Sequence, residues 1–489
     1  MSQPTALREK PAAAPTPTIG ERIDRMPITP THRRLTAVVG VGLLFDTFEN
    51  NLAGTISKVL QEDFAFNGTT LKLVLASAFI GQFFGSVILG RVADRYGRRR
   101  AFLINLALYS GFSLLGAFSP NAAWLIVTRF FAGVGIGAEQ SLSDCYLADV
   151  LPAKQRGRYT AWAYTLAFCG VPAVGFAALW LVPLSPLGID GWRWLFVLGA
   201  LGSAVVWVLR RNLIESPRWL AANGHEQQAH ELVARMEAEV PAAEHPQPQL
   251  QAGAGQPAPA PALTEPSTPA RVGAPAPAPA GAPAPAHPPA ARLREVFRAR
   301  YRRRTTMLWL FCTLSVVGYY GFGALAPQIL AAKGYDVVTS IGFTAVSFVG
   351  YPIGALLSVP VMDRMERKRL VALSAAAMAL SGLGFAYATS PTLIMALGIA
   401  YTLVSNIFST ASHVYLAEQY PTLIRAQATG LAYSLSKLSA AALPFALLPV
   451  LDTYGPGPMF GVIAAAMGTL VAVVLLLGPR TTGVAVDHH

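Results

Sequence analysis

The sequence is poor in charged residues and in cysteines. Charged side chains make up 13% of the 489 residues, about half of the roughly 25% that is usual in soluble domains, which argues against a soluble protein. The three cysteines lie in apolar segments and show neither zinc nor redox spacing. Walker and G-x-S-x-G motifs are absent as well. We therefore expect no metal and no cofactor, and we expect that the protein is not an enzyme.

Hydrophobic residues make up 53% of the chain and gather in segments of about 20 residues, long enough to cross roughly 30 Å of hydrocarbon. Polar backbone groups inside lipid must bond within their own segment, so each such segment is predicted to be a helix. The expected fold is an all-α membrane protein with twelve transmembrane helices. The predicted spans are residues 35–60, 71–93, 101–119, 123–147, 158–182, 192–213, 305–331, 340–362, 369–389, 392–417, 426–450 and 458–478.

The positive charges are arranged in alternation. The net charge is +12, and basic residues crowd every second connection, such as 95–100 and 364–369, while the connections between them hold few. An excess of basic residues marks the cytoplasmic side of a membrane protein. Both termini and the long central loop are therefore predicted to be cytoplasmic. The same pattern points to a lipid bilayer as the partner and argues against nucleic acid.

Two unrelated motifs recur at one interval. Asp94-Arg95 is repeated at Asp363-Arg364, and the motif at 146–149 is repeated at 415–418, so the two repeats share the same spacing along the chain. A shared interval indicates a duplicated half, so the twelve helices should form two pseudo-symmetric six-helix halves, as in many transporters. The expected organisation is a disordered cytoplasmic tail (1–32), a first half (33–214), a cytoplasmic linker (215–304) with an amphipathic helix at 226–240 and a Pro- and Ala-rich disordered centre (241–291), a second half (305–480) and a C-terminal tail (481–489).

Three motifs carry a family resemblance. Residues 90–99 (GRVADRYGRR) fit a GxxxDRxGRR loop after helix 2, residues 129–137 fit an RxxxGxGxG pattern in helix 4, and residues 215–220 (ESPRWL) fit a run after helix 6. On these motifs the chain resembles the major facilitator superfamily, and in particular its sugar-porter, organic-ion and aromatic-acid/proton symporter branches. The second copy of the loop departs from the pattern at Val359 and Glu366. The resemblance implies that two halves rock around a central site.

Ionisable residues at membrane depth need a partner or a cavity, because each costs about 2.5–3.5 kcal/mol to insert. Asp46 and Glu49 lie on one face of the first helix, and Arg129 lies in the fourth. At about 1.5 Å of rise per residue, Glu49 is closer in depth to Arg129 than Asp46 is, and it falls where related symporters place their proton-coupling acid. We expect Glu49, Asp46 and Arg129 to couple transport to protons, since burial favours the neutral acid and the arginine favours the charged one. A static ion pair is the alternative.

Other polar residues are candidates for substrate binding. Lys437 stands alone among serines in the eleventh helix, which favours an anionic substrate; snorkelling to the membrane interface is the alternative. Glu139 extends the helix-4 pattern to GxGxE, which is similar to organic-ion symporters. The remaining candidates are neutral polar or aromatic residues: Asn50, Gln82, Tyr319, Tyr320, Asn406 and Tyr433.

Asp144 and His413 occupy equivalent positions in the two halves. They form either a second proton relay or two separate contacts near the cytoplasmic helix ends. Charged clusters at the same side resemble the inner-gate networks of the family, and weak exposed ion pairs suit contacts that must break on opening. The predicted cytoplasmic gate comprises Asp94, Arg95, Arg98, Asp149, Arg156, Asp363, Arg364, Arg367, Glu418 and Arg425.

These features together predict a secondary active transporter. The expected function is proton-coupled symport of a small organic anion by alternating access, carried out by a monomer in a bacterial inner membrane. A sugar or polyol porter or a drug:proton antiporter on the same fold is one alternative. A nutrient sensor that has lost transport is another.

Overall fold

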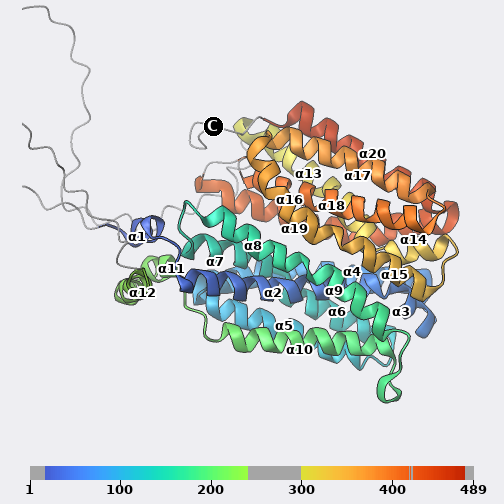
Figure 1. Ribbon diagram of the computed structural model, residues 1–489, viewed down its shortest axis with the longest axis horizontal. Coiled ribbons are helices and arrows are strands. Elements are labelled where there is room, and N and C mark those ends of the chain that lie inside the picture. Colours follow the sequence, from blue (N-terminus) through green and yellow to red (C-terminus); the bar gives the residue numbers. More distant parts are fainter. Residues whose placement is uncertain (1–16, 241–298, 418, 420–421, 480–489) are drawn as a thin grey trace, which may run out of the picture.

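The structure is a computed structural model, and it describes residues 17–240, 299–417, 419 and 422–479. Every regular element in these ranges is a helix, and most helices run side by side along one direction (Figure 1). The Pro- and Ala-rich centre 241–291, the C-terminal tail 481–489 and the first sixteen residues lie outside the described part.

The first half crosses the membrane six times. Eleven helices of the described chain are long and apolar enough to cross a membrane. The twelfth crossing is α2, whose 26 residues span about 39 Å and which is less apolar because it carries Asp46, Glu49 and two asparagines. The crossings of this half are α2 (Pro30–Thr55), α4 (Gly68–Tyr96), α5 (Arg98–Ala117), α6 (Ala122–Gly137) with α7 (Glu139–Val150), α8 (Arg156–Phe168) with α9 (Gly170–Leu181), and α10 (Gly191–Arg210).

The second half repeats this order. Its crossings are α13 (Ala299–Gly323), α15 (Val337–Phe348) with α16 (Gly350–Arg364), α17 (Arg367–Tyr387), α18 (Pro391–Ala417), α19 (Thr422–Tyr454) and α20 (Pro456–Leu477). Short helices α3 (Ser57–Asp63) and α14 (Ala326–Ala332) follow the first crossing of each half. The two halves lie against each other, with α19 packed on α4, α15 on α9 and α16 on α8 (Figure 1).

The duplication is also visible in how helices pack. Gly85 on α4 faces α6 so closely that a Cβ atom there would collide with the carbonyl oxygen of Val134. Gly354 on α16, which follows Gly85 at the interval of the repeated motifs, faces α18 in the same way, against the carbonyl oxygen of Leu403. Small residues let membrane helices approach this closely, so both halves use glycine at the same position for the same contact.

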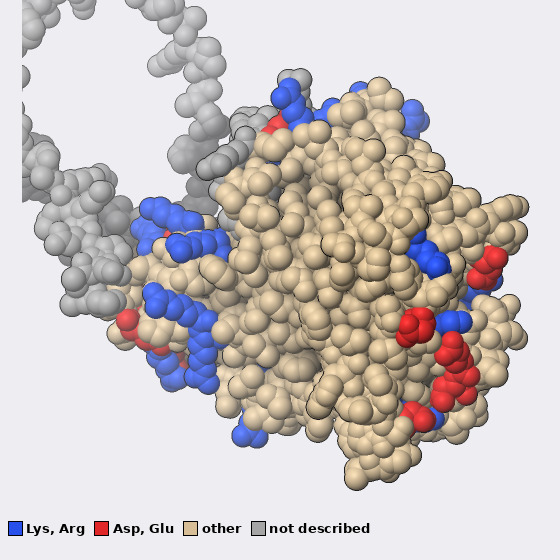
Figure 2. Space-filling model, turned by 45° about the vertical axis from the view of Figure 1, so that its right-hand side comes forward, with Lys and Arg blue, Asp and Glu red and all other residues tan. Residues whose placement is uncertain are grey.

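The outer surface fits a bilayer. Figure 2 shows lysine, arginine and acidic side chains gathered toward the two ends of the molecule, with a broad uncharged surface between them. Large apolar residues of the membrane-spanning helices are exposed, among them Leu201 and Val205 on α10 and Leu380 on α17. A soluble protein rarely exposes so much contiguous apolar area, and lipid is the solvent that this surface suits.

The expected disordered tail over 1–32 is wrong for its described part. Residues from 17 onward form α1 (Ile19–Arg25) and the start of α2. Ile19 and Ile23, one turn apart, are buried against α11 (Pro217–Ala222) and α12 (Glu226–Ala238), and Arg22 donates to Glu237 at 2.6 Å. Residues 19–25 are ordered because their short apolar stripe packs against apolar residues of the linker. The predicted helix at 226–240 is confirmed by α12.

Candidate functional site

A cavity of about 610 Å³ lies between the two halves. It runs from Asn50 and Tyr320 in the middle of the bundle to Asp94 near the end of α4. That end carries the α1, α11 and α12 helices, since Trp219 of α11 donates its indole N–H to the Asp94 carbonyl at 2.9 Å. At the opposite end, Gly54 lies directly against the backbone of Ala324. The cavity therefore extends toward the end that the charge pattern predicts to be cytoplasmic.

A buried ion pair lies beside this cavity. Glu49 on α2 accepts a hydrogen bond from Arg129 on α6 at 2.9 Å, and Ser113 on α5 donates its hydroxyl to the other carboxylate oxygen at 2.9 Å. The side chains of Glu49 and Arg129 are 1% and 4% exposed. This pairing agrees with the depths predicted from the sequence. Whether Glu49 carries the coupled proton stays a prediction.

The second acid of α2 has a different environment. Asp46 lines the cavity, as does Lys437 on α19 from the opposite half. The Oδ1 atom of Asp46 is buried and has no hydrogen-bond partner among the described residues. An unpartnered carboxylate oxygen at a cavity wall is free to accept a hydrogen bond from a ligand, a water molecule or a proton carrier.

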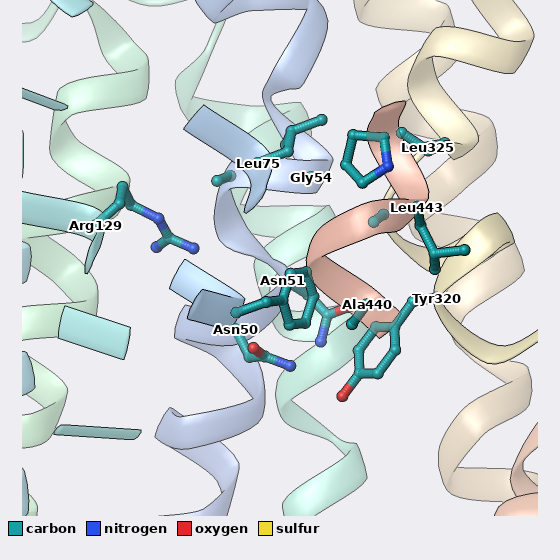
Figure 3. A pocket seen from close by; sticks show the side chains of 13 residues that line it. Asn50, Asn51, Gly54, Leu75, Arg129, Tyr320, Leu325, Ala440 and Leu443 are labelled. Carbon is teal, nitrogen blue, oxygen red and sulfur yellow. The ribbon is translucent and has the colours of Figure 1, made fainter. Parts of the chain in front are cut away.

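A smaller pocket adjoins the ion pair. Its volume is about 20 Å³, room for about one water molecule. Figure 3 shows Arg129 on one side of this pocket, with Asn50, Asn51 and Tyr320 on the other. The Nε atom of Arg129 is buried without a hydrogen-bond partner in the described part of the chain. The buried pair thus has a water-sized space next to it, with a mainly apolar lining that also includes Asn50, Asn51 and Tyr320.

Glu139 lies elsewhere. The sequence pattern placed it among the substrate-binding candidates, but it is not among the described residues that line the cavity. It pairs with Arg210 on α10, and both side chains are 0% exposed. The Arg210 guanidinium also lies 4.2 Å above the ring of Phe102. Sequence reasoning missed Arg210 because, followed by Arg211, it looks like the basic flank of a helix; its place at the end of a 20-residue apolar helix was the available signal.

Most other substrate candidates do line the cavity. One exception is Asn406, whose amide donates to the backbone oxygen of Tyr351 at 2.6 Å inside the second half. Gln82 donates to Asn50 at 2.6 Å, so these two amides act as one unit in the cavity wall. The candidates that line the cavity are Asn50, Gln82, Tyr319, Tyr320, Tyr433 and Lys437.

Asp144 and His413 each bond to a tyrosine of their own half. Tyr164 donates its hydroxyl to Asp144 at 2.5 Å, and the Tyr433 hydroxyl lies 2.5 Å from Nδ1 of His413. All four side chains line the cavity. Gln140 on α7 reaches across the interface, with its amide nitrogen 3.5 Å from Nε2 of His413.

Four of the first-half residues expected at the cytoplasmic gate form ion pairs within that half or with α1. Arg98 lies 2.6 Å from Asp94 and 3.9 Å from Asp149, whereas Arg156 pairs with Asp24 of α1 at 3.1 Å. Glu215, outside the predicted set, accepts from the backbone N–H of Arg98 at 2.8 Å.

The other gate candidates are one residue of the first half and the five residues of the second half. Arg95 projects over the Tyr96 ring at 5.5 Å, and Arg367 begins α17. The side chains of the remaining candidates lie outside the described residues: Asp363, Arg364, Glu418 and Arg425.

Comparison with known proteins identifies the family. The sequence profile of the Major Facilitator Superfamily matches residues 39–350. The chain belongs to the major facilitator superfamily. The profile described as sugar (and other) transporter matches residues 280–488. The protein is thus a multi-pass membrane transporter by family and by fold.

Several curated relatives and solved structures are similar over most of their length. The niacin transporter NiaP of Acinetobacter baylyi is 26% identical over 94% of this chain and 97% of its own. The gallate transporter of Pseudomonas putida is 27% identical over 92% and 93%. A partially occluded, inward-open structure of the xylose transporter XylE from E. coli superposes with a TM-score of 0.68 at 20% identity, covering 92% of this chain and 99% of that one, which supports the fold.

Proposed function

We propose that this protein is a secondary active transporter that moves a small organic anion together with a proton by alternating access. The buried Glu49–Arg129 pair beside the central cavity is the observation that carries the proposal. A buried carboxylate is stabilised in its charged form only while the guanidinium remains close to it. Any step that separates them leaves the acid in a poorly solvated site, where it binds a proton more readily.

The cavity supplies a means of separating the pair. Arg129 lines the small pocket that Asn50 and Asn51 also line, and those asparagines border the large cavity as well. An anion arriving in the cavity attracts Arg129 and Lys437, which weakens the hold of Arg129 on Glu49. Uptake of a proton by Glu49 then offsets the charge of the anion. One proton and one monovalent anion cross together without net charge.

Relatives suggest which anions to test first. Niacin and gallate, named for two of the relatives, are both aromatic carboxylic acids. Lys437 in the cavity wall is suited to a carboxylate, and Tyr319, Tyr320 and Tyr433 are suited to a ring. We propose that the protein acts as a monomer in a bacterial inner membrane, as its bacterial relatives suggest for the membrane, and the basic connections support a cytoplasmic location of both termini.

Uptake into proteoliposomes tests the proposal. Purified protein is reconstituted and supplied with labelled nicotinate, gallate or xylose, with and without an imposed pH gradient. We expect accumulation of an aromatic acid that requires the gradient and disappears when it is collapsed. Xylose uptake without anion uptake would favour a sugar porter, which the second family profile makes the runner-up. Accumulation driven by an outwardly directed gradient alone would indicate an antiporter, and binding without any uptake a sensor.

A further inference from the structure

The internal duplication relates two hydrogen-bonded pairs in the cavity, Tyr164 with Asp144 and Tyr433 with His413. His413 follows Asp144, and Tyr433 follows Tyr164, at the same interval at which the motifs of the two halves repeat. The duplication has thus kept a tyrosine at one position and diverged to aspartate and histidine at the other. Each tyrosine still holds its neighbour at 2.5 Å. The two equivalent positions thus hold an acid, Asp144, and a base, His413, which can form a hydrogen bond with each other.

Symmetry brings these residues toward each other. The halves of such transporters are related by an axis along the membrane normal, so repeat-related residues lie at one depth on opposite sides of that axis. Because all four side chains line the cavity between the halves, Asp144 and His413 face each other across it. The halves already touch close to this level, since the Gln140 amide lies 3.5 Å from His413 across the interface.

Gln140 marks how far the halves must move. His413 lies 3.5 Å from Gln140, and Gln140 precedes Asp144 by four positions on α7, about 6 Å along the helix axis. Because Asp144 and His413 lie at one depth, a rocking movement of similar size would transfer His413 from the amide to the carboxylate. Such a shift is small enough for rigid halves that rock.

We propose that Asp144 and His413 form a direct contact between the halves when the cytoplasmic mouth of the cavity closes, and that Tyr164 and Tyr433 hold them apart while it is open. The lock presupposes the alternating access of the proposed function but neither its substrate nor its proton. Lys437 lines the same cavity wall of the second half as His413. Closure exchanges the contact of His413 with the neutral Tyr433 hydroxyl for a contact with the Asp144 carboxylate, and charge-assisted hydrogen bonds are the stronger kind.

Distance measurement between the halves tests this lock without substrate or gradient. Spin labels are placed at the cytoplasmic ends of α4 and α13, and the distribution of distances between them is recorded by pulsed electron paramagnetic resonance on the full-length protein in nanodiscs. The labels replace Tyr96 and Arg302, in a background in which the native cysteines Cys145, Cys169 and Cys312 are changed to serine.

Two kinds of variant are expected to act in opposite directions. Asp144→Asn and His413→Gln should each reduce the short-distance, closed population at least about fivefold, the lower end of usual coupling between sites. Tyr164→Phe should increase it, because Asp144 loses the hydroxyl that holds it in the open state. The exchange of both residues, Asp144→His with His413→Asp, should restore the closed population.

Misfolding does not produce this pattern, since it cannot raise the closed population in Tyr164→Phe or restore it in the exchanged variant. The lock is refuted if the exchanged variant stays as open as the single variants, or if no variant alters the distances. Failure of proton-driven uptake with an intact distance pattern would overturn the proposed symport alone.

Discussion

Replacement of Glu49 by glutamine separates proton coupling from binding. The glutamine keeps the size of the side chain and an oxygen that can accept the 2.9 Å hydrogen bond from Arg129. Its amide nitrogen cannot accept the Ser113 hydroxyl, which now donates to the second carboxylate oxygen and must rotate. Removing one partner of a buried ion pair costs about 3–5 kcal/mol, and the retained hydrogen bond makes this an upper bound. We expect a folded, less stable protein.

The effect of Glu49→Gln on transport follows from the loss of the coupled proton. If one proton moves with each monovalent anion, a gradient of one pH unit supplies about 1.4 kcal/mol, or a tenfold accumulation. Glu49→Gln cannot carry that proton, so its accumulation ratio should fall from about tenfold to about one at the same gradient. Exchange of labelled for unlabelled substrate across the membrane should continue, because it needs no net proton movement.

The assay compares three proteins in the same proteoliposomes. Wild type, Glu49→Gln and Ser113→Ala are reconstituted at matched amounts, and the ratio of internal to external substrate is measured after a one-unit pH step with the membrane potential clamped. Ser113→Ala removes a hydrogen bond from the same carboxylate but leaves the acid in place, so it should still accumulate substrate. Tenfold accumulation by Glu49→Gln would refute the reasoning and turn attention to Asp46 and then Asp144.

Arg129 provides a second test of the same unit. Arg129→Ala leaves Glu49 without its cation, so accumulation should fail here too. In the double variant the loss should be less than the sum of the single losses, because both changes break one mechanism. Additive losses in initial uptake rate would mean that the two residues act separately.

Three other expectations concern stability, gating and topology. Arg210→Met should lower the free energy of unfolding by about 3–5 kcal/mol, measured by denaturant titration in detergent. Adding Glu139→Gln should recover much of that loss, because no unpaired buried charge then remains. If stability does not recover, the buried-pair reasoning is contradicted. Asp94→Asn should slow transport while leaving expression and thermal unfolding unchanged, and normal turnover would show that the loop is inherited scaffold. A reporter enzyme inserted within 241–291 should read out as cytoplasmic, and a periplasmic signal would reverse the orientation.

Features that depend on local sequence were predictable. The twelve helices follow from apolar segments of membrane length, because lipid leaves the backbone no other way to satisfy its polar groups. The duplication followed from one interval shared by two motifs, and the same interval relates Gly85 to Gly354 in the packing. The partner of Arg129 was also predictable, since helix rise converts position into depth. The depth of a residue in the membrane depends only on its position along the helix, so it can be calculated from the sequence.

Which way a side chain faces around its helix depends on all the neighbouring helices, and only the tertiary structure decided it. Glu139 and Asp144 lie on the same short helix, yet one is sealed against Arg210 and the other lines the cavity. The N-terminal segment is folded because of a partner far away along the chain: Ile23 is buried only when α12 lies beside it. The pairing of Tyr164 with Asp144 and of Tyr433 with His413 likewise required the helices to be placed side by side. Contacts between residues far apart in the chain depend on packing angles and rotations that no local pattern encodes.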